Sequence, residues 1–224
     1  MSVSEDRTVQ PSPTTAAPAS GIADPAPLGL AAFALTTFLL SAKNADWMSH
    51  ATGSAWLGFA FAYGGLGQLL AGMWEFRNRN VFGATAFATY GGFWIGLGLW
   101  VQLVVNPAVA AARPATLAAT VSGLNHDLGW ILLAFAIFNT YMLILSAQVN
   151  LAVFAVFLTL ELTEIILCIG NFNAGAALIP TTTIKIGGYV GLLTALVAWY
   201  ASAAGVSNGV AGKVRFPVGR PLIS

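Results

Sequence analysis

Long apolar runs, each broken by a short polar segment, dominate the chain from residue 27 onward. Six runs approach the ~20 residues that a bilayer-spanning helix needs. They cover residues 28–44, 55–74, 84–105, 128–147, 151–169 and 184–203. A membrane β-barrel would alternate apolar and polar residues in segments of ~10 residues, whereas these runs are long and apolar on all sides. The pattern therefore predicts an all-α membrane protein with six transmembrane helices.

Polar segments mark where these helices are expected to end. They lie at residues 43–46, 75–80, 106–107, 148–150 and 170–173, and are rich in Asn, Asp, Lys, Arg and Pro. Residues 1–26 are rich in Pro, Ser, Thr and Ala and lack an apolar run, which predicts a disordered N-terminal tail rather than a signal peptide. We expect a membrane domain over residues 27–203 and a C-terminal tail over residues 204–224.

The positions of Lys and Arg predict the orientation. With an even number of spans, Arg7, Arg77, Arg79, Lys213, Arg215 and Arg220 share one side, and Lys43, Arg113 and Lys185 share the other. Because cytoplasmic loops carry the excess of Lys and Arg, both termini are expected in the cytoplasm.

Composition excludes several classes of protein. Charged residues make up 8% of the chain, against about 25% in soluble domains, which argues against a soluble enzyme. A net charge of +1 offers no basic patch for nucleic acid. One cysteine, Cys168, and two histidines make a metal site improbable, and no nucleotide-binding loop is recognisable, so we expect no cofactor.

Ionisable residues within spans are costly in lipid and mark candidate functional positions. Glu161 and Glu164 lie three residues apart, on roughly one helix face, and could handle protons in a wet interior. The alternative is that one lies near the membrane surface or pairs with Lys185. Lys185 itself would either attract anions to a pore mouth or anchor its helix at the interface.

Glycine is frequent within the spans. The pairs Gly92/Gly96 and Gly187/Gly191 have the spacing that lets two helices approach closely in lipid. Such glycines could instead leave room for a narrow path. The prolines of residues 24–30, DPAPLGL, predict a helix N-terminus, whose free N–H groups favour anions.

Several segments in order resemble one known family. Residues 24–30, DPAPLGL, resemble the signature NPAPLGL of the acetate uptake transporter family, which includes bacterial succinate–acetate permeases and fungal acetate and ammonia-export proteins. Residues 63–68, YGGLGQ, resemble its YGGxxQ motif. Further matches lie at residues 71–76, 80–87, 90–94, 169–171, 185–189 and 215–219. Asp24 departs from the signature, because a carboxylate replaces an amide and would repel an anion unless neutralised.

The resemblance implies a six-span protomer with its own pore, assembled as a homo-hexamer. It also implies passage of acetate, and in some members succinate, through an apolar constriction formed by Phe33, Tyr90 and Leu160. The expected substrate-binding residues are Asp24, Pro25, Leu28, Thr37, Tyr63, Gln68, Asn171 and Lys185.

These observations together predict a plasma-membrane transporter of acetate and related short carboxylates, coupled to protons. The alternatives are a passive anion-selective channel, an ammonium or ammonia exporter, and a structural or sensory membrane protein. An enzyme is not expected, because no catalytic constellation is present in the sequence. The expected partners are small carboxylates, membrane lipid and further copies of the chain.

Overall fold

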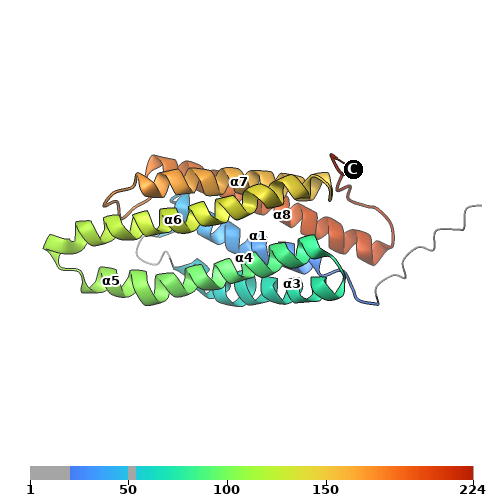
Figure 1. The fold of residues 1–224 in the computed structure, drawn as a ribbon, viewed down its shortest axis with the longest axis horizontal. Helices are drawn as coiled ribbons and strands as arrows, with labels where there is room; N and C mark the ends of the chain where they lie inside the picture. The colour runs from blue at the N-terminus through green and yellow to red at the C-terminus, as the bar shows by residue number, and fades with distance from the viewer. Residues whose placement is uncertain (1–20, 50–53, 224) are drawn as a thin grey trace, which may run out of the picture.

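A computed structural model describes residues 21–49 and 54–223, and these ranges form helices without any strand. The helices lie side by side in an elongated bundle (Figure 1). In chain order they are α1 (Ala26–Asn44), α2 (Ala55–Phe59), η1 (Ala60–Gly67), α3 (Gln68–Arg77), α4 (Val81–Trp100), η2 (Val101–Val105), α5 (Asn106–Ala111), α6 (Pro114–Ser146), α7 (Leu151–Phe172) and α8 (Thr182–Ala211). The predicted all-α class is confirmed; most of the tail predicted over residues 1–26 lies outside the described residues.

The two segments η1 and η2 are π-helical and join their neighbours without a break. In the described residues, five helical segments are long and apolar enough to cross a membrane. They are Ala26–Asn44, Val81–Ala111, Pro114–Ser146, Leu151–Phe172 and Thr182–Ala211. The run predicted over residues 55–74 is also helical, but it is not one of the five, so a sixth span stays a prediction.

The predicted helix end at Asn106-Pro107 is wrong, because the helix continues to Ala111. Pro107 lies in the first turn of α5, directly after the π-helical η2, where a missing backbone N–H is tolerated. Two further helices are longer than predicted. Helix α6 already begins at Pro114, where Thr116 and Arg113 cap its first turn, and α8 continues to Ala211 before Gly212 ends it with a φ of 61°.

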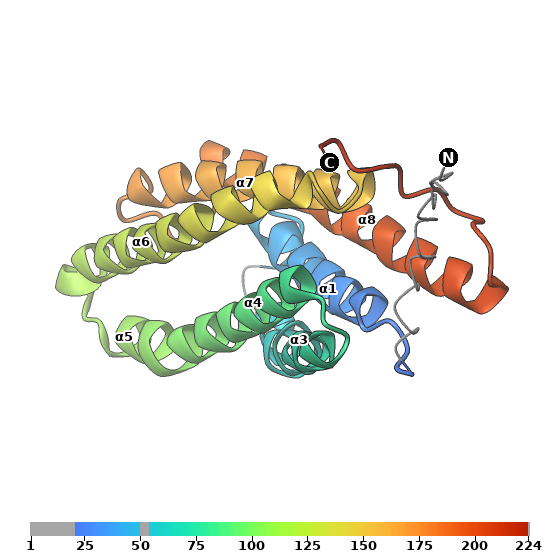
Figure 2. The same ribbon diagram turned by 45° about the vertical axis from the view of Figure 1, so that its right-hand side comes forward.

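Helices α1 and α8 pack closely, and α1 lies between α8 and the α3–α4 pair (Figure 2). A methyl group added at Gly188 would overlap the backbone of Ala45, and one added at Gly191 would overlap the Ser41 hydroxyl. A methyl group at Gly187 would likewise overlap the Leu167 side chain, so close approach at Gly187 and Gly191 is confirmed. Within this chain, the predicted close approach of helices at Gly92 and Gly96 is wrong, because a methyl group added at either position would meet no other part of the chain within 4 Å.

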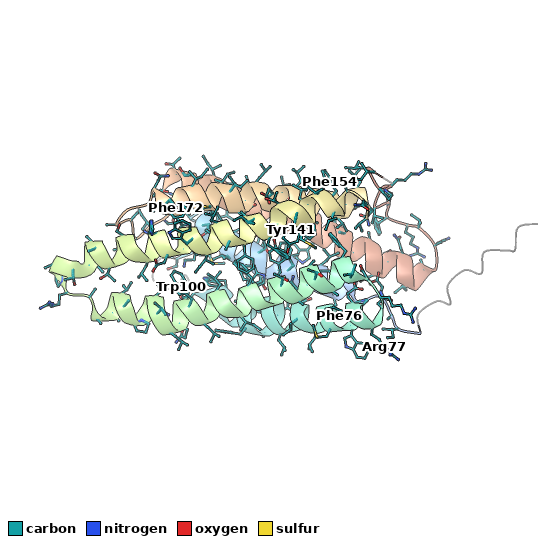
Figure 3. All side chains as sticks on the ribbon, viewed as in Figure 1. Phe76, Arg77, Trp100, Tyr141, Phe154 and Phe172 are labelled. Carbon is teal, nitrogen blue, oxygen red and sulfur yellow. The ribbon has the colours of Figure 1, made fainter. Side chains whose placement is uncertain are left out.

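The start of α1 and the end of α8 lie at the same end of the bundle (Figure 1). Arg77, labelled in Figure 3, lies at this end too, in the last turn of α3. Lys43 ends α1 and Lys185 begins α8, so both lie at the opposite end. Arg77 thus lies at one end of the bundle and Lys43 and Lys185 at the other, as predicted. Which end faces the cytoplasm stays a prediction.

The C-terminal tail folds back onto the bundle after α8. The Tyr200 hydroxyl donates to the Pro217 carbonyl at 2.7 Å, and the amide of Ala152 donates to the Val218 carbonyl at 2.9 Å. The amide of Leu222 donates to the Ala147 carbonyl at 2.8 Å. These bonds connect α8 to the turn between α6 and α7.

Candidate functional site

The three residues expected to form a constriction meet in the centre of the bundle. Phe33 comes from α1, Tyr90 from α4 and Leu160 from α7, and all three belong to one buried hydrophobic cluster. Their exposed fractions are 5%, 3% and 6%. The rings of Phe33 and Tyr90 meet edge to face, with centroids 5.8 Å apart. Helix packing alone therefore brings these residues from three distant segments into one apolar layer.

A cavity of about 220 Å³ opens on one flank of this layer. Phe33 and Leu160 contribute to its walls from the buried cluster, and Lys43 and Asn44 contribute from the end of α1. Trp100, labelled in Figure 3, contributes from the end of α4. We call it the Lys43 cavity. Because one buried water needs only ~10–15 Å³ on this measure, the cavity can hold a small hydrated molecule.

A second cavity, of about 370 Å³, lies between the beginning of α4 and the end of α6. Val81, Phe82, Tyr141 and Met142 contribute to its walls, and Figure 3 labels Tyr141; we call it the Tyr141 cavity. Met142 is also part of the buried cluster that contains Phe33. The cluster therefore contributes walls to both cavities, which lie along opposite halves of α4.

A network of polar side chains, buried at Tyr90, Asn139 and Glu164, adjoins the apolar layer. The Tyr90 hydroxyl lies 2.9 Å from Asn139 Oδ1 and 3.3 Å from Glu164 Oε1. Asn139 Nδ2 donates to Glu161 Oε2 at 2.7 Å, and the Thr140 hydroxyl donates to Glu161 Oε1 at 2.8 Å. Glu161 and Glu164 thus share one network, as their spacing predicts. Asn139 and Thr140 are not recognisable from the sequence, because a single amide or hydroxyl in an apolar run has no distinguishing spacing.

The lysine that lines the cavity is Lys43 rather than the predicted Lys185. Lys185 Nζ lies 2.5 Å from Asp46 Oδ2, so its charge is paired, and it is not among the residues that line the Lys43 cavity. The alternative in which Lys185 pairs with Glu161 or Glu164 is therefore wrong, because its partner is Asp46. Lys43 lines the cavity instead, with its ammonium 5.7 Å from the centre of the Trp56 ring. Its position at the end of an apolar run was the only sequence indication.

The other predicted binding residues divide into three groups. Thr37 and Asn171 line the Lys43 cavity. Gln68 is 1% exposed on α3, and Tyr63 lies in η1. A third region, at the start of α1, holds Asp24, Pro25 and Leu28, where Asp24 Oδ1 accepts a hydrogen bond from the backbone amide of Ala26 at 3.0 Å. Contact of these residues with substrate stays a prediction.

Comparison with known proteins connects this geometry to a function. Residues 6–219 match the model of the GPR1/FUN34/yaaH family. Acetate permease A of Emericella nidulans is 41% identical over 189 residues, which cover 83% of this chain and 62% of that protein. The chain thus spans about three fifths of this relative's length.

Two bacterial comparisons extend over almost the whole of the matched protein. The succinate-acetate/proton symporter SatP of Escherichia coli is 31% identical over 198 residues, covering 88% of this chain and 96% of that protein. The solved structure of the bacterial acetate channel SatP matches with a TM-score of 0.72 and 30% identity, covering 88% of this chain and 99% of that chain. These relatives are named as a permease, a symporter and a channel, not as enzymes.

Proposed function

The chain belongs to the GPR1/FUN34/yaaH family, and we propose that it transports acetate and related short carboxylates across a membrane. It is a multi-pass membrane protein, since five of its described helices can each cross a bilayer. The observation that carries the proposal is the apolar layer of Phe33, Tyr90 and Leu160, whose cluster contributes walls to two cavities. This arrangement suits a small solute that crosses one short apolar barrier.

The apolar layer selects the form in which the solute crosses. A carboxylate anion must lose its water there without gaining a charged partner, which is far more costly than for the neutral acid. Side-chain carboxyl groups have pKa values near 4, so at neutral pH the acid is a small fraction of a short carboxylate. Uptake through this layer should therefore rise as the external pH falls.

Proton coupling is part of the proposal. Glu161 and Glu164 share a hydrogen-bond network with the constriction, in which the Tyr90 hydroxyl lies within hydrogen-bond distance of Glu164. Hydrogen bonds through Asn139 continue from Tyr90 to Glu161. A connected network of this kind supports the transfer of a proton beside the substrate path.

Further parts of the proposal rest on the family relationship and the sequence. They are a sixth span over residues 55–74, both termini in the cytoplasm, a plasma-membrane location and assembly as a homo-hexamer with one pore in each protomer. Native mass spectrometry in detergent tests the assembly. A dominant hexamer is expected, and a stable monomer that transports acetate at the full rate would contradict it.

Uptake of labelled acetate and succinate by proteoliposomes tests the function. Protein-free liposomes serve as the blank, because acetic acid crosses lipid unaided. We expect uptake above the blank that accumulates acetate when the outside is made more acidic. Uptake equal to the blank at every pH would refute transport. Single-channel currents without uphill accumulation would instead identify the passive anion channel.

A further inference from the structure

The chain after α8 is held in a fixed position by a side-chain clamp. Asn208 Oδ1 accepts hydrogen bonds from the backbone amides of Arg215 at 2.7 Å and Phe216 at 3.0 Å. Asn208 Nδ2 donates to the Phe216 carbonyl at 2.9 Å. Backbone bonds to the α6–α7 turn fix the remainder. We call residues 215–223 the tail segment; its backbone is ordered by the rest of the bundle.

The tail segment lies where two membrane-spanning helices end. Its Val218 carbonyl accepts a hydrogen bond from the amide of Ala152, in the first turn of α7. Its Leu222 amide donates to the carbonyl of Ala147, directly after the end of α6. Both helices are long and apolar enough to cross a bilayer. Tyr200, whose hydroxyl also bonds the segment, is 42% exposed, and tyrosine is enriched at membrane–water interfaces. The segment therefore follows the boundary between lipid and water, and Figure 2 shows the chain passing from the end of α8 toward α7.

The exposed side chains of the tail segment are basic or apolar. Arg215 and Arg220 are exposed and make no ion pair within the described part of the chain. Phe216, Leu222 and Ile223 are exposed by 46%, 52% and 51%. No Asp or Glu lies between the end of α7 and Ile223, so no neighbour in the sequence neutralises the arginines.

This combination of side chains matches one class of partner. A guanidinium group can form two parallel hydrogen bonds to a phosphate. Apolar side chains at a membrane surface are buried at the boundary between headgroups and acyl chains. A freely soluble anion would use the arginines and leave the apolar side chains in water. An anionic phospholipid uses both kinds of side chain, and its negative charge complements the basic segment.

We propose that the tail segment is a docking surface for an anionic phospholipid. Arg215 and Arg220 bind the headgroup phosphate, and Phe216 contacts the acyl chains next to the headgroup. Asn208 is a positioning residue, because it holds Arg215 and Phe216 at the lipid boundary. The inference goes beyond the proposed function and does not depend on which solute is transported.

Native mass spectrometry of the full chain in non-ionic detergent at low salt, titrated with dioleoylphosphatidylglycerol, tests the surface. Dioleoylphosphatidylcholine has the same acyl chains without a net charge and is the comparison lipid. One basic residue near an anionic lipid surface is worth about fivefold in affinity. We therefore expect Arg215→Gln and Arg220→Gln each to weaken phosphatidylglycerol binding about 3- to 5-fold, and phosphatidylcholine binding less than about twofold. Arg113→Gln, at the opposite end of the bundle, is the matched control and should bind both lipids as the wild type does.

Asn208→Ala separates position from charge, because it keeps every basic residue. We expect it to weaken phosphatidylglycerol binding about threefold, the effect of losing the hydrogen bonds that place Arg215. Wild-type affinity in Asn208→Ala would overturn the positioning role.

Three results would overturn the docking surface itself. They are equal affinity of the wild type for the two lipids, wild-type affinity for phosphatidylglycerol in both arginine variants, and an equal loss in Arg113→Gln. Displacement of phosphatidylglycerol by the same concentration of soluble glycerol phosphate would show a site for a free anion and overturn the lipid assignment. The preference for phosphatidylglycerol should decrease as salt is raised, since exposed charges are screened.

Discussion

Removal of the Tyr90 hydroxyl separates the two roles of this side chain. Tyr90→Phe keeps the ring that packs edge to face on Phe33, but it removes the donor to Asn139 Oδ1 and Glu164 Oε1. Both acceptors are fully or almost fully buried. Because a hydroxyl has one hydrogen to donate, one buried acceptor at a time loses its partner.

The loss of such a partner costs about 1–3 kcal/mol. For a chain of this size, each kcal/mol corresponds to about 2–4 °C in Tm, so a value near 2 kcal/mol lowers Tm by about 4–8 °C. The size limit of the constriction should stay unchanged, since the ring remains. The response of uptake to external pH should weaken, because the link between Glu164 and Asn139 is broken.

Thermal unfolding of purified protein in detergent measures the first effect, and uptake of acetate and succinate at pH 6 and pH 8 measures the other two. Tyr141→Phe is the matched control, because its hydroxyl makes no hydrogen bond to Asn139 or Glu164. An unchanged Tm together with an unchanged pH response would refute the role of the network. Faster uptake of succinate by Tyr90→Phe would show that the hydroxyl, rather than the ring, limits substrate size.

Other substitutions test the rest of the site and the packing. Phe33→Ala should raise the uptake of succinate relative to acetate by about tenfold, measured with labelled substrates, because a large side chain leaves the constriction. Lys43→Gln should raise the KM for acetate about 3- to 5-fold at low salt and less at high salt, as expected for one charge near an anion. Lys213→Gln should leave KM unchanged, and an equal effect of both would contradict a local role. Gly191→Ala should lower Tm, since its methyl group overlaps Ser41 and such overpacking costs about 1–3 kcal/mol, whereas Gly92→Ala should leave Tm unchanged.

Helix positions were predictable from sequence because lipid imposes a simple requirement. A chain that spans a bilayer must satisfy its backbone internally, so each long apolar run becomes a helix. The exception at Pro107 is a local effect: the π-helical residues before it and its place in the first turn of α5 remove the conflict. Periodicity and composition do not encode such adjustments.

The site was less predictable, because its residues depend on contacts between distant segments. Phe33, Tyr90 and Leu160 were identified through the family resemblance, since their side chains are not distinguishable from other apolar residues in the spans. The charge of Lys185 is neutralised by Asp46, which is 139 positions away in the chain. Trp56 and Trp94 were missed for the same reason: only the folded chain shows that they line the same cavity as Glu164.

The tail that folds back after α8 affects how the protein can be engineered. Its backbone bonds to Ala147 and Ala152 mean that a purification tag or fluorescent fusion placed directly after Ile223 begins against the α6–α7 turn. A C-terminal fusion therefore needs a flexible spacer. A truncation designed to aid crystallisation should retain the chain through Ile223, because a shorter product exposes backbone groups that the native fold pairs.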